Sequence, residues 1–167
     1  MKQITAVAVM VLTVLAATAA SPDKQIVFHS AGDGMLVFVK PRKMAKTATS
    51  SASKPLDYDI TLSTQSDTVS VTFTLVSKSA SLRIDSTSVN SSHRYVNERL
   101  YVEPKSKNWI YRLRFKMPQD DFEATFCGDS PLELSVDNCG FQIPKKKQPK
   151  EAEICRTAVN IIEMNRK

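Results

Sequence analysis

Apolar and polar residues alternate strictly along several stretches of this chain, and that period of two constrains the fold more than any other feature. In residues 109–117 large apolar side chains fill every second position, with mostly basic side chains between them. Residues 56–63 and 69–75 repeat the period. Because successive side chains of a β-strand point to opposite faces, each stretch predicts a strand with one buried and one solvated face.

Shorter apolar runs extend this pattern and predict a mainly β fold. Residues 25–30 and 35–40 flank an Ala-Gly-Asp-Gly joint that favours a tight hairpin. A second hairpin is expected between residues 56–63 and 69–75, and residues 86–96 are expected to be a polar loop. Eight or nine short strands with polar turns predict an antiparallel β-sandwich or a partly open barrel. Five more of these strands are expected at residues 82–84, 100–102, 109–117, 122–126 and 132–134, and residues 139–143 are a further candidate.

The C-terminal residues 145–167 predict a Lys-rich linker followed by one helix. Pro149 suits the first turn of a helix, and apolar residues then recur at helical spacing. The helix is therefore expected to pack on the sheet. Its apolar stripe consists of Ile154, Cys155, Ala158, Ile161 and Ile162.

The first twenty residues are typical of a signal peptide. Lys2 precedes an apolar run that ends in the small residues Ala17-Thr18-Ala19-Ala20. No later segment approaches the roughly 20 apolar residues that a membrane-spanning helix needs. The sequence thus predicts export of a single β domain, residues 21–144, to the periplasm or the cell exterior, with no transmembrane segment after signal removal.

Basic residues gather in two places that predict a binding surface. Residues 41–55 read as a mobile loop rich in Ser, Thr, Ala and Lys, and the polar face of residues 109–117 carries a row of cations. The aromatic residues of that strand lie on its opposite face, which argues against stacking on the bases of a nucleic acid. An envelope protein or an anionic glycan or lipid surface is the expected partner. The candidate binding residues are Arg42, Lys43, Arg112, Arg114 and Lys116.

Catalytic motifs are missing from the sequence, so an enzyme is the less favoured interpretation. His29 and His93 lack the spaced partners of a zinc site, and no glycine-rich phosphate loop occurs, so neither a metal nor a cofactor is predicted. The pairs Asp57 with Asp59 and Asp120 with Asp121 could serve a glycoside hydrolase as two carboxylates across a cleft. Solvated surface acids explain both pairs more simply.

The three cysteines allow at most one disulfide within the chain. In a meander of three strands, Cys127 and Cys139 would lie at opposite ends of the sheet, farther apart than the ~7 Å that a disulfide tolerates between Cα atoms. Cys155 lies on the apolar stripe of the helix. The strand that begins at Cys139 would run back across the sheet, so the helix that follows it would begin at the end of the sheet where Cys127 lies. A Cys127 to Cys155 disulfide is therefore the candidate, and three unpaired thiols are the alternative.

The layout of signal peptide, LDYDITLSTQSDTVSVTFTL, LYVEPKSKNWIYRLRF and a Lys-rich helical tail resembles small exported β-rich proteins of unknown function from Bacteroidetes. The resemblance implies an envelope or secreted location and assigns no functional residue. The favoured function is a non-enzymatic binding or structural module of the cell envelope or extracellular space. The alternative is a secreted hydrolase with a jelly-roll-like core that acts on glycans.

Overall fold

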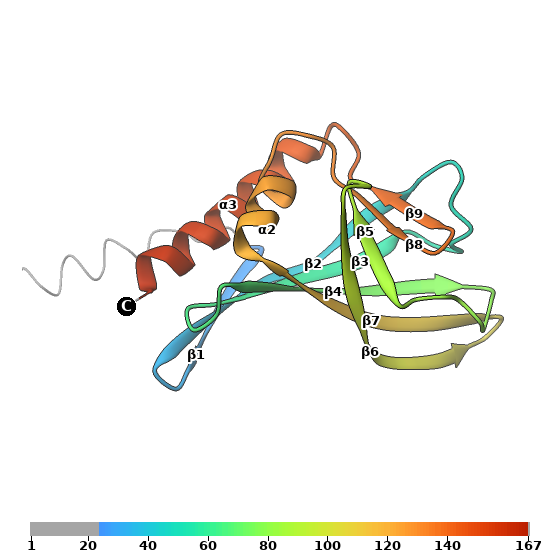
Figure 1. The fold of residues 1–167 in the computed structure, drawn as a ribbon, viewed down its shortest axis with the longest axis horizontal. Coiled ribbons are helices and arrows are strands. Elements are labelled where there is room, and N and C mark those ends of the chain that lie inside the picture. The colour runs from blue at the N-terminus through green and yellow to red at the C-terminus, as the bar shows by residue number, and fades with distance from the viewer. Residues whose placement is uncertain (1–23, 167) are drawn as a thin grey trace, which may run out of the picture.

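A computed structural model describes residues 24–166 and shows one antiparallel sheet of nine strands in the order β1-β2-β3-β4-β7-β6-β5-β8-β9 (Figure 1). Strand β2 also pairs with β9, so the eight strands other than β1 close into a barrel. The strands are β1 (Ile26–Ala31), β2 (Gly34–Lys46), β3 (Leu56–Ser63), β4 (Thr68–Ser77), β5 (Ser86–Val89), β6 (His93–Lys105), β7 (Asn108–Pro118), β8 (Glu133–Val136) and β9 (Cys139–Gln142).

Two long, bent strands explain how the sheet closes. The pairing of β2 with β3 slips between Val39 and Arg42, around Pro41, and the pairing of β6 with β7 slips between Arg99 and Tyr101. Such irregularities bend a strand and increase its twist. As a result β2 pairs with β1 and β3 and then reaches β9, while β6 pairs first with β5 and then with β7.

Two helices cover one side of the barrel. Helix α2 (Gln119–Phe126) follows β7 directly, and helix α3 (Gln148–Asn165) packs against β2, β3 and α2 (Figure 1). Ile154, Cys155, Ala158 and Ile162 of α3 are all buried, as the helical stripe predicted. Arg166 closes the helix end by donating to the backbone oxygen of Ser66.

The inward side chains fill the barrel with an apolar core. Strand β3 shows the expected alternation perfectly, with every second residue from Leu56 to Leu62 buried. Burying a side chain of this size contributes about 1.5–3 kcal/mol. The largest fully buried side chains include Tyr58, Phe73, Phe115, Phe122, Phe126, Phe141 and Met44.

The structure confirms a mainly β fold with a C-terminal helix, and both predicted hairpins are present. The sheet itself is a closed barrel, so the sandwich and the partly open barrel were wrong. The β1–β2 turn has its positive φ at Gly32, the first central position, where two-residue hairpins of type II′ require glycine.

Three other predicted elements were wrong. Residues 122–126 belong to helix α2, because Phe122 and Phe126 lie four apart and share one helical face as readily as one strand face. Residues 82–84 form no strand. The supposed polar loop 86–96 contains β5, the start of β6 and a tight turn in which Asn90 and Ser91 have positive φ.

The predicted mobile loop at residues 41–55 begins later than expected. Residues 41–46 are the second half of β2, where Met44 is fully buried. The rest of the segment is fixed by backbone hydrogen bonds, from Thr47 to Gly140, from Ser51 to Asn138 and from Ser53 to Val76. The predicted signal peptide lies outside the described residues.

Candidate functional site

Arg42, a predicted surface cation, holds helix α3 to the barrel instead. Its Nε donates to one carboxylate oxygen of Glu151 at 2.6 Å and its Nη2 donates to the other at 2.5 Å. The Tyr58 hydroxyl donates to the same carboxylate at 3.3 Å. Burial, with the nearby charge of Glu151, raises the pKa of Tyr58 well above its usual value. Only 12% of the Arg42 side chain is exposed, because it lies between β2 and α3.

The basic row on β7 is present, and two of its three cations are paired with acids on β3 and β6. Arg112 pairs with Asp59 and also donates to the hydroxyl of Thr74. Arg114 forms two hydrogen bonds to Glu98, at 2.8 and 3.0 Å. Lys116 is exposed, and among residues 24–166 it has no ion-pair partner.

Lys43 of β2 lies in one cross-strand row with Asp57 of β3, Thr74 of β4 and Arg112 of β7, and its side chain is 4.0 Å from Asp57. Both side chains are exposed, and an exposed pair of this kind contributes little to stability. Of the five predicted binding residues, the structure separates Arg42, which pairs with Glu151 of α3, from the other four, which lie on the outer face of the sheet.

Neither predicted acid pair forms a cleft with two free carboxylates. Asp57 and Asp59 share the outer face of β3, where Asp59 is held by Arg112. Asp120 and Asp121 lie in the first turn of α2, where acids favour the positive end of the helix. Asp121 accepts a hydrogen bond from Tyr95 at 2.8 Å. Burial and this bond raise the pKa of Tyr95.

The structure brings Cys127 and Cys155 together beneath α3. All three cysteines are free and buried. A hydrogen bond with Cys127, together with burial, raises the pKa of the Cys155 thiol well above its usual value. Cys139 lies apart from this pair, 3.3 Å from the hydroxyl of Ser51. The Cys127 to Cys155 disulfide stays a prediction, and the contact between the two thiols supports it.

Two other features bear on the class of site. In the described part of the chain, no helix is long and apolar enough to cross a membrane. Across the same residues, His, Cys, Asp and Glu side chains form no group of three that could hold a metal ion. His29 lies exposed on β1, and the ring of His93 stacks on Tyr95.

A charged pocket that the sequence did not reveal lies on the outer surface of the barrel, beside β5. The pocket measures about 230 Å³ and is lined by Arg83, Asp85, Ser86, Arg94 and Asp137. These residues come from the β4–β5 connection, the starts of β5 and β6, and the β8–β9 turn. We refer to them as the Arg83–Arg94 pocket.

Strand pairing brings these residues together. Ser88 of β5 lies opposite Arg94 of β6 on one side and opposite Ser135 of β8 on the other. Continuing the β5–β8 register by two residues sets Asp137 beside Ser86. Asp137 has a positive φ of 52°, which fits the tight turn that leads β8 into β9.

The arginines and acids that line this pocket form no ion pairs within residues 24–166. Arg94 donates from Nε to the hydroxyl of Ser86 at 2.6 Å, which fixes its guanidinium and leaves its other donors open. Arg83 has no hydrogen-bond or ion-pair partner among residues 24–166. Two guanidinium groups that donate and two carboxylates that accept can together bind a polar ligand that carries an acidic group.

Comparisons of the chain with models of protein families, with curated proteins and with solved structures gave no match.

Proposed function

We propose that this chain is an exported, non-enzymatic binding module whose Arg83–Arg94 pocket binds an acidic group of a glycan. The observation that supports binding is the Arg83 guanidinium, which lines a pocket and has no partner among the described residues. A planar guanidinium pairs with carboxylate, sulfate or phosphate through two parallel hydrogen bonds. Export is the proposal drawn from residues 1–20, and the resemblance to exported proteins of Bacteroidetes agrees with it.

The acids of the pocket favour a glycan over a bare anion. Asp85 and Asp137 would repel a simple anion. A sugar has hydroxyl groups, and each of them can donate a hydrogen bond to a carboxylate. The acidic substituent of the sugar would pair with Arg83 and Arg94. The pocket thereby matches both kinds of group that an acidic sugar carries.

A secreted glycan hydrolase is the second candidate, because two carboxylates line this one pocket. Catalysis would need one of these acids to protonate the leaving oxygen and the other to activate water or attack the sugar. Four of the five lining residues are exposed, including both acids. An open, wet pocket favours binding, because solvent weakens the electrostatic stabilisation that a transition state requires.

The test compares two ligands that differ in charge alone. Isothermal titration calorimetry is run with an oligogalacturonate and with its methyl ester of the same length. The acid is expected to bind, with the ester at least about tenfold weaker, since a hydrogen bond to a charged group contributes about 1.5–3 kcal/mol. Equal binding of both, or of neither, would refute the proposed acidic group.

Two variants assign the effect to the pocket. Arg83→Gln and Arg94→Gln are each expected to weaken oligogalacturonate binding by about tenfold or more. Arg114→Gln is the control, since it removes a half-buried guanidinium outside the pocket that already pairs with Glu98. Release of new reducing ends from the oligosaccharide by the unaltered protein, and not by an Asp85→Asn variant, would favour the hydrolase instead.

A further inference from the structure

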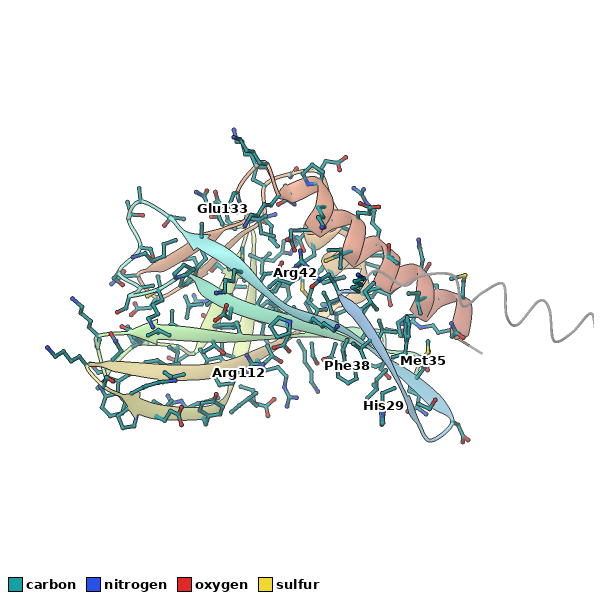
Figure 2. The ribbon with its side chains drawn as sticks, turned by 180° about the vertical axis from the view of Figure 1, so that it is seen from behind. His29, Met35, Phe38, Arg42, Arg112 and Glu133 are labelled. Carbon is teal, nitrogen blue, oxygen red and sulfur yellow. The ribbon has the colours of Figure 1, made fainter. Side chains whose placement is uncertain are left out.

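In the described part of the chain, strand β1 is the one strand with an edge that no other strand covers. A closed barrel leaves no strand edge exposed. The eight other strands complete that closure through the β2–β9 pairing, and β1 pairs only with β2 in the described part of the chain. Figure 2 shows the β1–β2 hairpin, with His29 and Met35 labelled, projecting past the body of the barrel.

The outward hydrogen-bonding groups of β1 follow from its register. The amide of Lys40 donates to the carbonyl of Gln25 at 2.8 Å, so Gln25 faces β2. Antiparallel pairs alternate, so Val27 and His29 also direct their backbone groups to β2. The backbone N–H and C=O groups of Ile26, Phe28 and Ser30 therefore point away from the sheet.

Strand β1 lacks the features that normally prevent an edge strand from pairing with another molecule. Natural edges carry a charge, a proline or a bulge. From Ile26 to Ser30 the strand has none of these, and its pairing with β2 is regular. Val27 and Phe28 are 43% and 40% exposed. The nearest charges lie at opposite ends of the hairpin, Lys24 before β1 and Asp33 in the turn after it.

We propose that β1 pairs with β1 of a second copy of this chain, antiparallel about a two-fold axis at Phe28. In this register Phe28 faces Phe28 and Ile26 faces Ser30, which matches every outward donor with an acceptor. Lys24 of each copy then lies opposite Gly32 of the other, next to Asp33. Lys24 of each copy forms an exposed ion pair with Asp33 of the other, one at each end of the interface. The sheets of the two copies are then joined into a single continuous sheet.

Charge decides between the antiparallel arrangement and its alternatives. A parallel pairing in register would set Lys24 against Lys24 and Asp33 against Asp33. The edge is short, so we expect a dissociation constant in the micromolar range, as is usual for small interfaces. The interface shares no residue with the Arg83–Arg94 pocket, whose residues come from the β4–β5 connection, the starts of β5 and β6, and the β8–β9 turn.

Sedimentation equilibrium of the purified protein across a concentration series tests the proposal. Dimer is expected to form as concentration rises, and a protein that remains monomeric up to about 1 mM would overturn it. Phe28→Pro removes one outward N–H without touching a bond to β2, and is expected to abolish the dimer. Phe28→Lys sets two cations side by side and is expected to do the same. A dimer that survives both changes would refute the β1 edge.

A charge swap tests the register without relying on either Phe28 variant. Lys24→Glu alone and Asp33→Lys alone are each expected to weaken dimerisation by roughly tenfold, since each turns two attractive contacts repulsive. The double variant restores both pairs and is expected to recover the original dissociation constant. Additive weakening in the double variant would exclude the antiparallel register. Circular dichroism confirms that each variant keeps its fold.

Discussion

Charged and polar side chains gather in two regions of this molecule, and the two regions differ in whether those side chains satisfy one another. Beneath α3, Arg42, Glu151 and Tyr58 bond together, and the thiols of Cys127 and Cys155 are in contact. In the Arg83–Arg94 pocket, the two arginines form no ion pair with the two acids beside them.

The contrast separates two uses of polar residues. A buried charge must be paired, because water no longer solvates it, so the cluster under α3 fixes where the helix docks. An exposed charge keeps its water and remains available to a ligand. Four expectations follow from this division, and the first, second and fourth concern the helix-covered side.

Removal of Glu151 is expected to have the largest effect. Glu151→Ala removes the carboxylate that accepts two hydrogen bonds from Arg42, a side chain only 12% exposed. Breaking a largely buried ion pair in this way costs about 3–5 kcal/mol of unfolding free energy. Urea denaturation measures the change. Glu98→Ala is the matched control, because it removes the carboxylate from the half-exposed pair with Arg114 and should cost below about 1 kcal/mol. Equal losses of unfolding free energy in the two variants would contradict a structural role specific to the pair under α3.

The Cys127 to Cys155 disulfide is expected in protein recovered from an oxidising compartment. Two thiols lose two protons and two electrons to the disulfide of a thiol oxidoreductase, and a sulfur–sulfur bond forms. For a loop of this length the crosslink would stabilise the fold by about 3 kcal/mol. Peptide mapping of the non-reduced, unfolded protein should find this bridge, with Cys139 alone alkylated. Alkylation of all three cysteines would contradict it.

The Arg83–Arg94 pocket should affect binding and leave stability nearly unchanged. Arg83→Gln combined with Arg94→Gln is expected to remove about 3 kcal/mol or more of binding free energy for an acidic sugar. Its unfolding free energy should stay within about 0.5 kcal/mol of the original, as for most surface changes. Calorimetry and urea denaturation on one preparation measure both. A large loss of stability would assign these arginines a structural role.

Alkaline pH is expected to give the smallest effect, and only on the helix-covered side. The raised pKa of Tyr58 means that the folded state holds its proton more tightly than the unfolded state does. Its contribution to stability is complete below pH ~10 and is lost as pH rises further, by less than about 1 kcal/mol up to pH 10.5. Thermal unfolding between pH 9 and 10.5 should show a shallower loss for Tyr58→Phe. Tyr101→Phe, on an exposed tyrosine, should behave as the original protein does.

The sequence predicted strands and the last helix where one face is buried and the other wet. Along β3, β4 and β7 the buried positions are apolar and most of the exposed positions are polar, so the period of two is visible in the sequence. Trp109 was also expected in the core, yet it is only partly buried, because it lies next to the exposed β6–β7 turn. Strand β5, Ser-Thr-Ser-Val, carries too few apolar residues to be recognised.

The functional residues could not be predicted in the same way. Arg42 was expected on the surface because its acid partner lies 109 residues later in the chain. The pocket combines Arg83 from the β4–β5 connection, Arg94 from the start of β6 and Asp137 from the β8–β9 turn, and no spacing along the chain marks them. Only the strand order, which depends on how β2 and β6 bend, brings them together.

The β2–β9 pairing, which closes the barrel, also sets the order in which this chain can fold. It joins Ala45 and Lys46 to Gln142 and Phe141, through only two pairs of residues. The hairpins β1–β2 and β3–β4 are local and can form early, whereas the closing contact requires nearly the whole chain. During synthesis the barrel therefore stays open until β9 has emerged, and helix α3, encoded last, fixes the closed state by docking on β2.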